Sequence, residues 1–97
     1  MTHRLARLSK QFKKDYKKLK DSGRYKMETL QIVLNLLLQK ESLPEKYQDH
    51  PLRGTWQGCR DCHIEGDWIL LYEIGLNEDG LEMVIFHRTG NHANLFE

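Results

Sequence analysis

The chain has 97 residues, of which 39% are hydrophobic and 30% are charged, and its formal net charge is +1. A chain of this length is expected to fold as a single domain, here residues 1–97, with a modest core. Its composition argues against disorder. The chain lacks both the roughly 20 consecutive apolar residues of a membrane span and the apolar core of a signal peptide. A cytoplasmic protein is therefore expected, with no membrane partner.

Basic residues are concentrated at the N-terminal end. Residues 1–26 hold ten Lys/Arg and two Asp, a balance of +8, whereas residues 27–97 hold five Lys/Arg and twelve acids, a balance of −7. Such a basic segment attracts polyanions, either nucleic acid or an acidic partner protein. The alternative is an ordinary solvated helix face, because lysine is a common surface residue of helices.

The first half of the chain predicts one strand and two helices. Residues 3–8 favour an edge strand, because apolar residues alternate loosely along them. A helix is expected over residues 10–21, with Ser9 as its N-cap and Gly23 just past its end. A second helix over residues 25–39 is apolar enough to be covered by a sheet or another helix. Helical spacing predicts buried stripes of Phe12, Tyr16 and Leu19, and of Met27, Leu30, Leu34, Leu37 and Leu38.

The second half predicts a three-stranded antiparallel meander. Its strands cover residues 54–64, 67–74 and 81–88, with turns at residues 65–66 and 77–80. Alternation places Trp68, Leu70, Tyr72 and Ile74 on one face of the middle strand, and Ile69 and Leu71 on the other. Together with the N-terminal strand, the order is β-α-α-β-β-β. This order predicts an α+β domain with two helices packed on one face of a small antiparallel sheet.

Imidazole, carboxylate and guanidinium groups gather in this second half. Asp61 and His63 lie two apart in one predicted strand, so they share a face. Histidine transfers protons near neutral pH, and the whole set is expected to converge on one end and face of the sheet. The alternative is that each histidine separately caps a turn or lies in solvent. The set comprises His50, Asp61, His63, Asp67, Arg88 and His92.

Cys59 and Cys62 have the C-x-x-C spacing of some zinc sites, and His50 and His63 lie nearby. Two features argue against a metal. Residues three apart in a strand point to opposite faces, and the pair lacks the Gly or Pro of a tight knuckle. We expect no metal and no cofactor. A zinc-linked interaction module built on these four residues remains an alternative.

Three segments of the chain resemble the YafQ-type branch of the RelE/ParE toxin superfamily: residues 49–56, 60–72 and 88–96. The similarity spans the whole chain, including the lysine-rich first helix. It implies a RelE-like fold and a ribosome-dependent messenger-RNA endonuclease, the toxin of a bacterial toxin–antitoxin pair. Its implied partners are a cognate antitoxin, the ribosome and mRNA.

The resemblance also implies roles for single residues. Cleavage by the RNA 2′-OH needs a base, an acid and positive charge against the phosphorane, without a metal. His92 would supply the acid or base, with His50 or His63 as its complement. Asp67 would orient an imidazole, and Arg88 would bind the scissile phosphate. Asp61 would support these residues, and Trp68 and Phe96 would stack on a base or form a wall of the pocket. The lysines of the first helix would bind ribosomal RNA: Lys10, Lys13, Lys14, Lys17 and Lys18.

Two features qualify this similarity. Cys62 stands where the family has a small residue, and Cys59 is also unusual, although neither belongs to the catalytic pattern. Trp68 fits a core position as well as a stacking position. A ParE-like toxin that acts on gyrase without nuclease chemistry shares the fold, but such a toxin has no need for three imidazoles.

Overall fold

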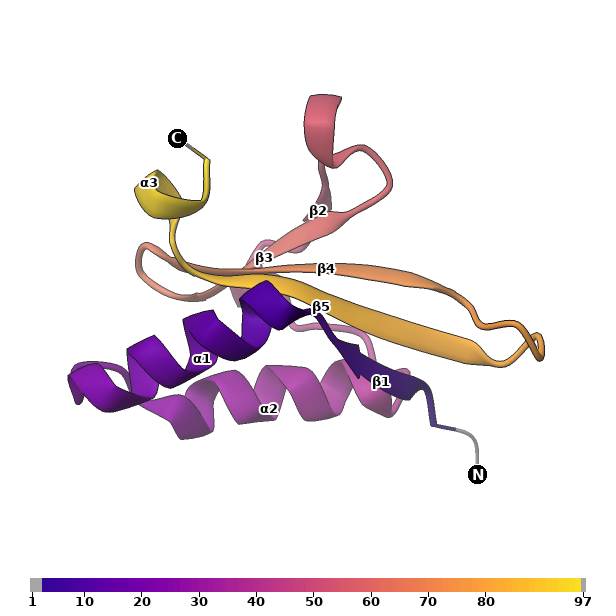
Figure 1. Ribbon diagram of the computed structural model, residues 1–97, viewed down its shortest axis with the longest axis horizontal. Helices are drawn as coiled ribbons and strands as arrows, with labels where there is room; N and C mark the ends of the chain where they lie inside the picture. The colour runs from indigo at the N-terminus through magenta and orange to yellow at the C-terminus, as the bar shows by residue number, and fades with distance from the viewer. Residues whose placement is uncertain (1–2, 97) are drawn as a thin grey trace.

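A mixed sheet with the strand order β1-β5-β4-β3-β2 forms the centre of the molecule. The computed structural model describes residues 3–96. Helices α1 (Lys10–Ser22) and α2 (Met27–Leu38) cover one face of the sheet, and α3 (His92–Leu95) lies on the opposite side (Figure 1). The strands are β1 (Leu5–Leu8), β2 (His50–Pro51), β3 (Arg60–Glu65), β4 (Trp68–Leu76) and β5 (Glu82–Asn91). No helix within residues 3–96 is long and apolar enough to cross a membrane.

The predicted antiparallel meander is confirmed as β3-β4-β5. Strand β1 joins it at one edge, parallel to β5, with Leu5 opposite Met83. The short strand β2 joins the other edge, where His50 pairs with Asp61. The α+β fold with both N-terminal helices on one face is therefore confirmed. The expectation of an entirely antiparallel sheet was wrong, because β1 runs parallel to β5. Strand β2 and the single-turn helices η1 (Glu45–Tyr47) and η2 (Gly54–Trp56) were not predicted.

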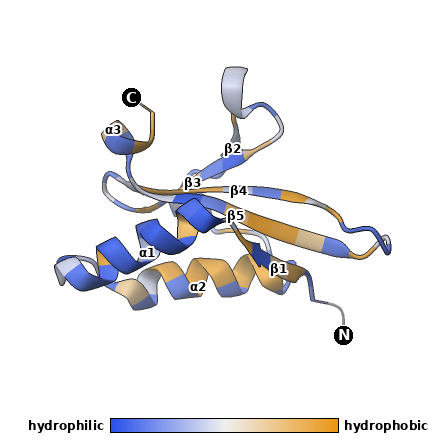
Figure 2. Ribbon diagram, viewed as in Figure 1, coloured by the Kyte–Doolittle hydropathy of each residue, from blue (hydrophilic) through white to orange (hydrophobic). Residues whose placement is uncertain are grey.

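Helix α1 has the boundaries that its end residues favour. The Ser9 hydroxyl accepts a hydrogen bond from the Phe12 N–H at 2.9 Å, which satisfies one of the free donors of the first turn. Gly23 ends the helix with φ 71°, a conformation that costs glycine little. Phe12 and Leu19 are buried, whereas the lysines form the hydrophilic outer face (Figure 2).

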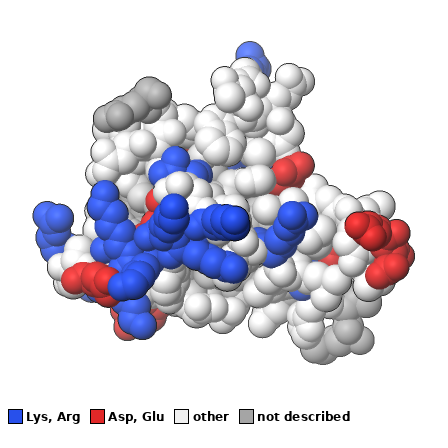
Figure 3. Space-filling model, viewed as in Figure 1, with Lys and Arg blue, Asp and Glu red and all other residues white. Residues whose placement is uncertain are grey.

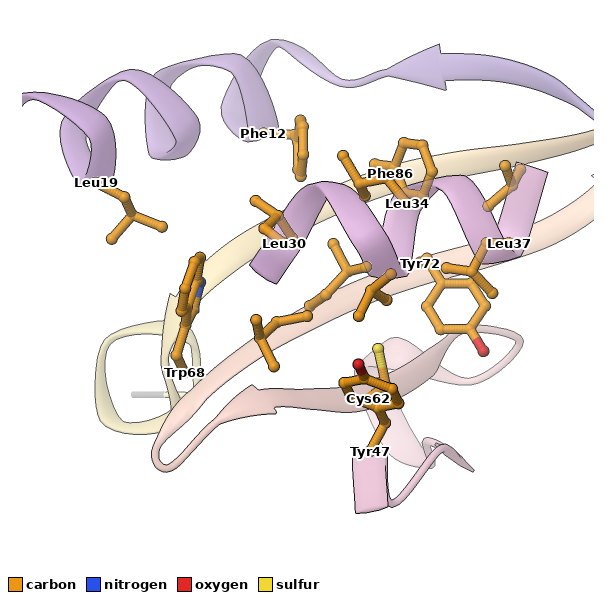
Figure 4. Packing of buried hydrophobic residues seen from close by; sticks show 14 residues of the cluster. Phe12, Leu19, Leu30, Leu34, Leu37, Tyr47, Cys62, Trp68, Tyr72 and Phe86 are labelled. Atoms are coloured by element: carbon orange, nitrogen blue, oxygen red, sulfur yellow. The ribbon is translucent and has the colours of Figure 1, made fainter. Parts of the chain in front are cut away.

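The main core lies between the sheet and the two helices. Trp68, Leu70 and Tyr72 of β4 belong to it, together with buried residues of both helices. Figure 4 shows Trp68 and Tyr72 in this packing. Ile69 and Leu71 point to the other face, into a smaller cluster with Leu95. The predicted alternation of β4 is thus confirmed. Burial of each such leucine or isoleucine contributes about 1.5–3 kcal/mol.

Several predicted boundaries were wrong, including the following three. The strand expected from residue 54 begins only at Arg60, because Gly54 and Gly58 adopt φ values of 68° and 94° that interrupt an extended chain. The hairpin turn lies at residues 66–67, since Glu65 still pairs with Trp68. Strand β5 continues to Asn91 and passes directly into α3, where the Asn91 side chain caps the helix by accepting from the Asn94 N–H at 2.9 Å.

Candidate active site

Two rows of paired residues cross the face of the sheet that α1 and α2 leave open. The first row runs through His50, Asp61, Leu71 and Arg88. The second row runs through His63, Ile69 and Gly90. Directly paired residues project to the same side of a sheet, and residues two apart in a strand share a face. For His50, Asp61, His63 and Arg88, the strand register therefore agrees with the predicted convergence on one face.

His50 is oriented by the loop that precedes it. Its Nδ1–H donates to the Gln48 carbonyl at 2.7 Å, because a carbonyl oxygen only accepts. The proton on Nδ1 leaves Nε2 as the basic nitrogen of the neutral ring. This Nε2 lies 3.8 Å from Oδ2 of Asp61. A protonated His50 would therefore gain a carboxylate partner.

Asp49 holds this loop against the sheet. Its two carboxylate oxygens accept hydrogen bonds from the Arg60 guanidinium, at 3.1 Å from Nε and 3.2 Å from Nη2. It also accepts from the Tyr72 hydroxyl at 2.5 Å. Charge-assisted, two-point contacts of this kind limit rotation of both partners. Asp49 thus positions the neighbouring His50 without belonging to either row.

Asp61 is the buried centre of the group. Only 2% of its surface is exposed, and within residues 3–96 its Oδ1 has no hydrogen-bond partner. Burial raises the pKa of the Asp61 carboxyl, and the imidazoles of His50, His63 and His92 oppose that shift. A buried carboxylate that faces three titratable rings is an arrangement typical of functional sites.

His92 and Asp67 meet where β5 leaves the sheet. The backbone N–H of His92 donates to the Asp67 carbonyl at 3.0 Å, and both side chains are exposed. The His92 ring centroid lies 4.7 Å from that of Phe96. Phe96 therefore forms a wall beside His92, which agrees with one of its two predicted roles.

Arg88 is held by a residue that the sequence analysis did not identify. Its Nε and Nη2 donate to the Asp15 carboxylate at 2.8 and 3.2 Å, and Asp15 also accepts from the Thr89 N–H at 3.1 Å. A guanidinium has five N–H donors, so three of them remain for a phosphate. Asp15 lies between Phe12 and Leu19 on the buried side of α1. An acidic residue within an apolar stripe is the sequence feature that could have indicated a buried partner for it.

The structure contradicts the predicted contact between Trp68 and an RNA base. Trp68 is 3% exposed, and its indole N–H donates to the Thr89 hydroxyl at 2.9 Å. Its ring packs edge-on against Tyr25, with the centroids 5.0 Å apart. A side chain with both its apolar surface and its donor satisfied in the core has no surface left for stacking.

The predicted lysines form an exposed surface on α1, called the lysine face below (Figure 3). A groove of about 430 Å³ lies between the second half of α1 and the end of β5. Lys18, Arg24 and Arg88 all line it. The groove therefore connects the lysine face with the arginine of the first row. The lysine face comprises Lys10, Lys13, Lys14, Lys17 and Lys18.

The structure also contradicts the zinc-linked module on the C-x-x-C pair. Cys62 is fully buried in the core on the helix side of the sheet, whereas Asp61 and His63, its chain neighbours, face the open side. Cys59 lies three residues before Cys62, on the open side with Asp61. The two sulfurs therefore project to opposite faces, as the strand spacing predicted.

A small sheet with two N-terminal helices on one face and histidines on the other is the architecture expected of a RelE-type toxin. A family model described as the bacterial toxin of a type II toxin–antitoxin system, YafQ, matches residues 4–97. The mRNA interferase toxin YafQ of Escherichia coli K12 is 41% identical over 97 residues, which cover 99% of each chain. The chain therefore belongs to the YafQ family of bacterial toxins of type II toxin–antitoxin systems.

Solved structures agree with this assignment. YafQ from E. coli BL21(DE3) superposes with a TM-score of 0.82 at 40% identity, over 97% of this chain and 99% of that one. The E. coli DinJ–YafQ toxin–antitoxin complex matches with a TM-score of 0.80 at 41% identity, over 98% and 99%. A metal-bound toxin from Helicobacter pylori matches with a TM-score of 0.80 at 32% identity, over 95% and 98%.

Proposed function

We propose that this chain is an mRNA interferase that cuts messenger RNA on the translating ribosome. In this proposal residues 1–97 act as one toxin domain in the cytoplasm, and a cognate antitoxin neutralises it. The observation that carries the proposal is the buried Asp61 with the His50 ring 3.8 Å away. Arg88 lies in the same row, on the far side of Leu71. Family membership supports it, because the E. coli relative is an mRNA interferase.

The proposed reaction is attack by the RNA's own 2′-OH on the adjacent phosphorus. One imidazole removes the 2′ proton as the 2′-O–P bond forms, and another protonates the 5′-oxygen as the P–O5′ bond breaks. The products are a 2′,3′-cyclic phosphate and a 5′-hydroxyl. Acid–base catalysis of this type contributes about 100- to 10,000-fold in rate.

We assign the proton transfers to His50 and His92. The Nδ1–H bond of His50 to Gln48 leaves Nε2 free to accept a proton, which suits a base, and Asp61 would stabilise the resulting imidazolium. His92, the first residue of α3, would be the acid, and its ring lies beside Phe96. His63 would assist from the second row. Asp67, next to His92 through the backbone, would favour the protonated ring.

Arg88 would bind the scissile phosphate. Its three donors that do not contact Asp15 can hold two phosphate oxygens, and the Asp15 pair keeps the guanidinium plane in place. Positive charge fixed in advance lowers the energy of the phosphorane without reorganisation during the reaction. In this scheme Asp15 is a positioning residue.

The lysine face would bind ribosomal RNA. Its side chains are exposed on one side of α1 (Figure 3), and the groove beside Arg88 continues this positive surface toward the site. Phosphate contacts anchor a protein without reading sequence. Codon preference would therefore depend on the open face of the sheet.

The experiment is cleavage mapping by primer extension on a defined mRNA. Purified toxin is added to the free mRNA and to the same mRNA on programmed ribosomes. We expect cuts only in the presence of ribosomes, with a 5′-hydroxyl at each new end. Equal cleavage of free mRNA would contradict ribosome dependence. Intact mRNA together with inhibited gyrase supercoiling would favour the ParE-like alternative.

A further inference from the structure

A second group of side chains with metal-ligand chemistry lies on the open face of the sheet. The Cys59 sulfur, a Glu73 carboxylate oxygen and a His87 ring nitrogen all lie within 4.8 Å of one another. None of the three belongs to the proposed catalytic set. They come from three segments: the end of the β2–β3 connection, strand β4 and strand β5.

The strand register brings these residues together. Arg60 pairs with Tyr72, so Cys59 before it stands opposite Glu73 after it. Between β4 and β5 the register shifts, with Leu71 opposite Arg88 but Tyr72 opposite Phe86. His87 is the extra residue of this β-bulge, and bulges redirect side chains. Its Nε2 lies 3.0 Å from Oε1 of Glu73.

The three donors suit a zinc ion. Thiolate, imidazole and carboxylate are the ligand types that Zn²⁺ prefers, with bonds of about 2.0–2.3 Å, so tetrahedral ligand atoms lie about 3.3–3.8 Å apart. The present separations, at most 4.8 Å, exceed that range by no more than about 1 Å. Cys59 is 8% exposed, whereas the side chains of Glu73 and His87 are 40% and 26% exposed. The solvent side leaves room for water as a fourth ligand.

We propose that Cys59, Glu73 and His87 form a three-ligand site for Zn²⁺, separate from the catalytic histidines. The ion would fasten the segment of η2 to the two central strands. Trp56 of η2 already lies near His87, with ring centroids 6.1 Å apart, and it packs on the small apolar cluster of the open face. Cys59 would bind as the thiolate, so binding releases a proton.

Cobalt substitution tests the sulfur ligand directly. Full-length toxin carrying His50→Gln and His63→Gln, which remove two of the three imidazoles of the proposed catalytic site, is titrated with Co²⁺. We expect one ion per chain and a near-ultraviolet thiolate-to-cobalt charge-transfer band. Adding Cys59→Ser should abolish the band, whereas Cys62→Ala should retain it. A band that is absent before the cysteine change, or that survives Cys59→Ser, would overturn the proposal.

Equilibrium dialysis with Zn²⁺ tests the other two ligands. Glu73→Gln and His87→Gln should each weaken zinc binding by at least about 100-fold, since changes beyond the ligand shell alone cost 10- to 100-fold. Both side chains are partly exposed, so these variants carry the test even if Cys59→Ser does not fold. Unchanged affinity in both variants, or zinc that is lost only with His50 and His63, would place the metal elsewhere and contradict the site.

Discussion

The two faces of the sheet divide stability from chemistry. On the helix side, Trp68, Leu70 and Tyr72 join a continuous apolar core. On the open side, Ile69 and Leu71 belong to a small cluster, which the histidines, Asp61 and Arg88 surround. Because strand β4 supplies both faces by simple alternation, substitutions at neighbouring positions of β4 can both affect folding, but only those on the open face should also affect the proposed reaction.

The open face contains a destabilising feature, a buried polar atom without a hydrogen-bond partner, that the described residues of the helix face lack. Asp61 is buried with one carboxylate oxygen unpaired within the described residues, and a buried unsatisfied polar group costs about 1–3 kcal/mol. Within residues 3–96 the buried side-chain polar atoms on the helix side are paired, as in the contact between Trp68 and Thr89. Destabilising buried carboxylates of this kind are typical of functional sites. The comparison therefore predicts different outcomes for matched changes on the two sides.

The largest effect is expected from His92→Ala. Cleavage on the ribosome should slow by about 100- to 10,000-fold, while thermal unfolding changes little because the ring is exposed. In a substrate with sulfur in place of the 5′-oxygen, the leaving group is a thiolate that needs no protonation. This substrate should therefore restore much of the cleavage rate of His92→Ala. The same substrate should leave a His50→Ala defect unchanged. Equal rescue of both variants would contradict the assignment of His92 as the acid.

A matched pair of leucines on β4 separates the two faces next. Leu70 and Leu71 are both fully buried, so each change to alanine should lower the free energy of unfolding by about 2–5 kcal/mol. Below the unfolding transition, Leu70→Ala should cleave at a near-normal rate. Leu71→Ala should cleave more slowly, because Leu71 lies between Asp61 and Arg88 in the first row. Denaturant unfolding and cleavage rates check both statements, and equal activities would remove the distinction between the faces.

Local periodicity explains why much of this fold could be predicted. The stripe of α1 and the alternation of β4 are both repeated patterns, and each identified the correct buried side. The RelE-like resemblance indicated the polar residues that the strand register then brought to one face. The Ser9 cap and the Gly23 end were readable for the same reason, since each depends only on neighbouring residues.

The features that sequence did not reveal depend on register or on distant contacts. Asp15 and Arg88 are 73 residues apart in the chain, and no local pattern pairs them. The grouping of Cys59 with His87 depends on a bulge, which periodicity does not encode. Trp68 was ambiguous because an aromatic residue fits both a core and a stacking surface. Tertiary packing decided each of these.

Asp61→Asn should change how stability depends on pH. Burial raises the folded pKa of Asp61 above its unfolded value, so its contribution to stability is fully present below the unfolded pKa and is lost as pH rises through the folded pKa. Relative to the wild type, Asp61→Asn should therefore be more stable at neutral pH than at acid pH. Urea unfolding of both proteins from pH 4 to pH 7 measures the difference, and a pH-independent difference would contradict it.

Neutralising the lysine face should weaken binding without changing the cleavage site. Changing Lys13, Lys14, Lys17 and Lys18 to Gln removes only exposed charges. The log–log salt slope of ribosome co-sedimentation should fall by about 0.7–0.9 for each phosphate that a lysine no longer neutralises, and the cut codons should stay the same. A variant that binds ribosomes like the wild type at every salt concentration would show that this surface is only solvated.

The smallest effect on the cleavage rate is expected from removing bound metal or from replacing both cysteines. Proton transfer by imidazoles and charge stabilisation by Arg88 need no metal in the proposed reaction, so toxin stripped by dialysis against EDTA should cleave at the original rate. The chelator must be removed before assay, because ribosomes need Mg²⁺. The double variant with Cys59→Ser and Cys62→Ala should also cleave at the rate of the unmodified toxin. Alanine is chosen at Cys62 because this residue is fully buried, and a serine hydroxyl there would cost about 1–3 kcal/mol. If stripping or the double variant abolishes cleavage of a folded protein, and zinc restores the stripped protein, the ion belongs to the reaction. The open face would then combine metal and histidine chemistry rather than hold them in separate groups.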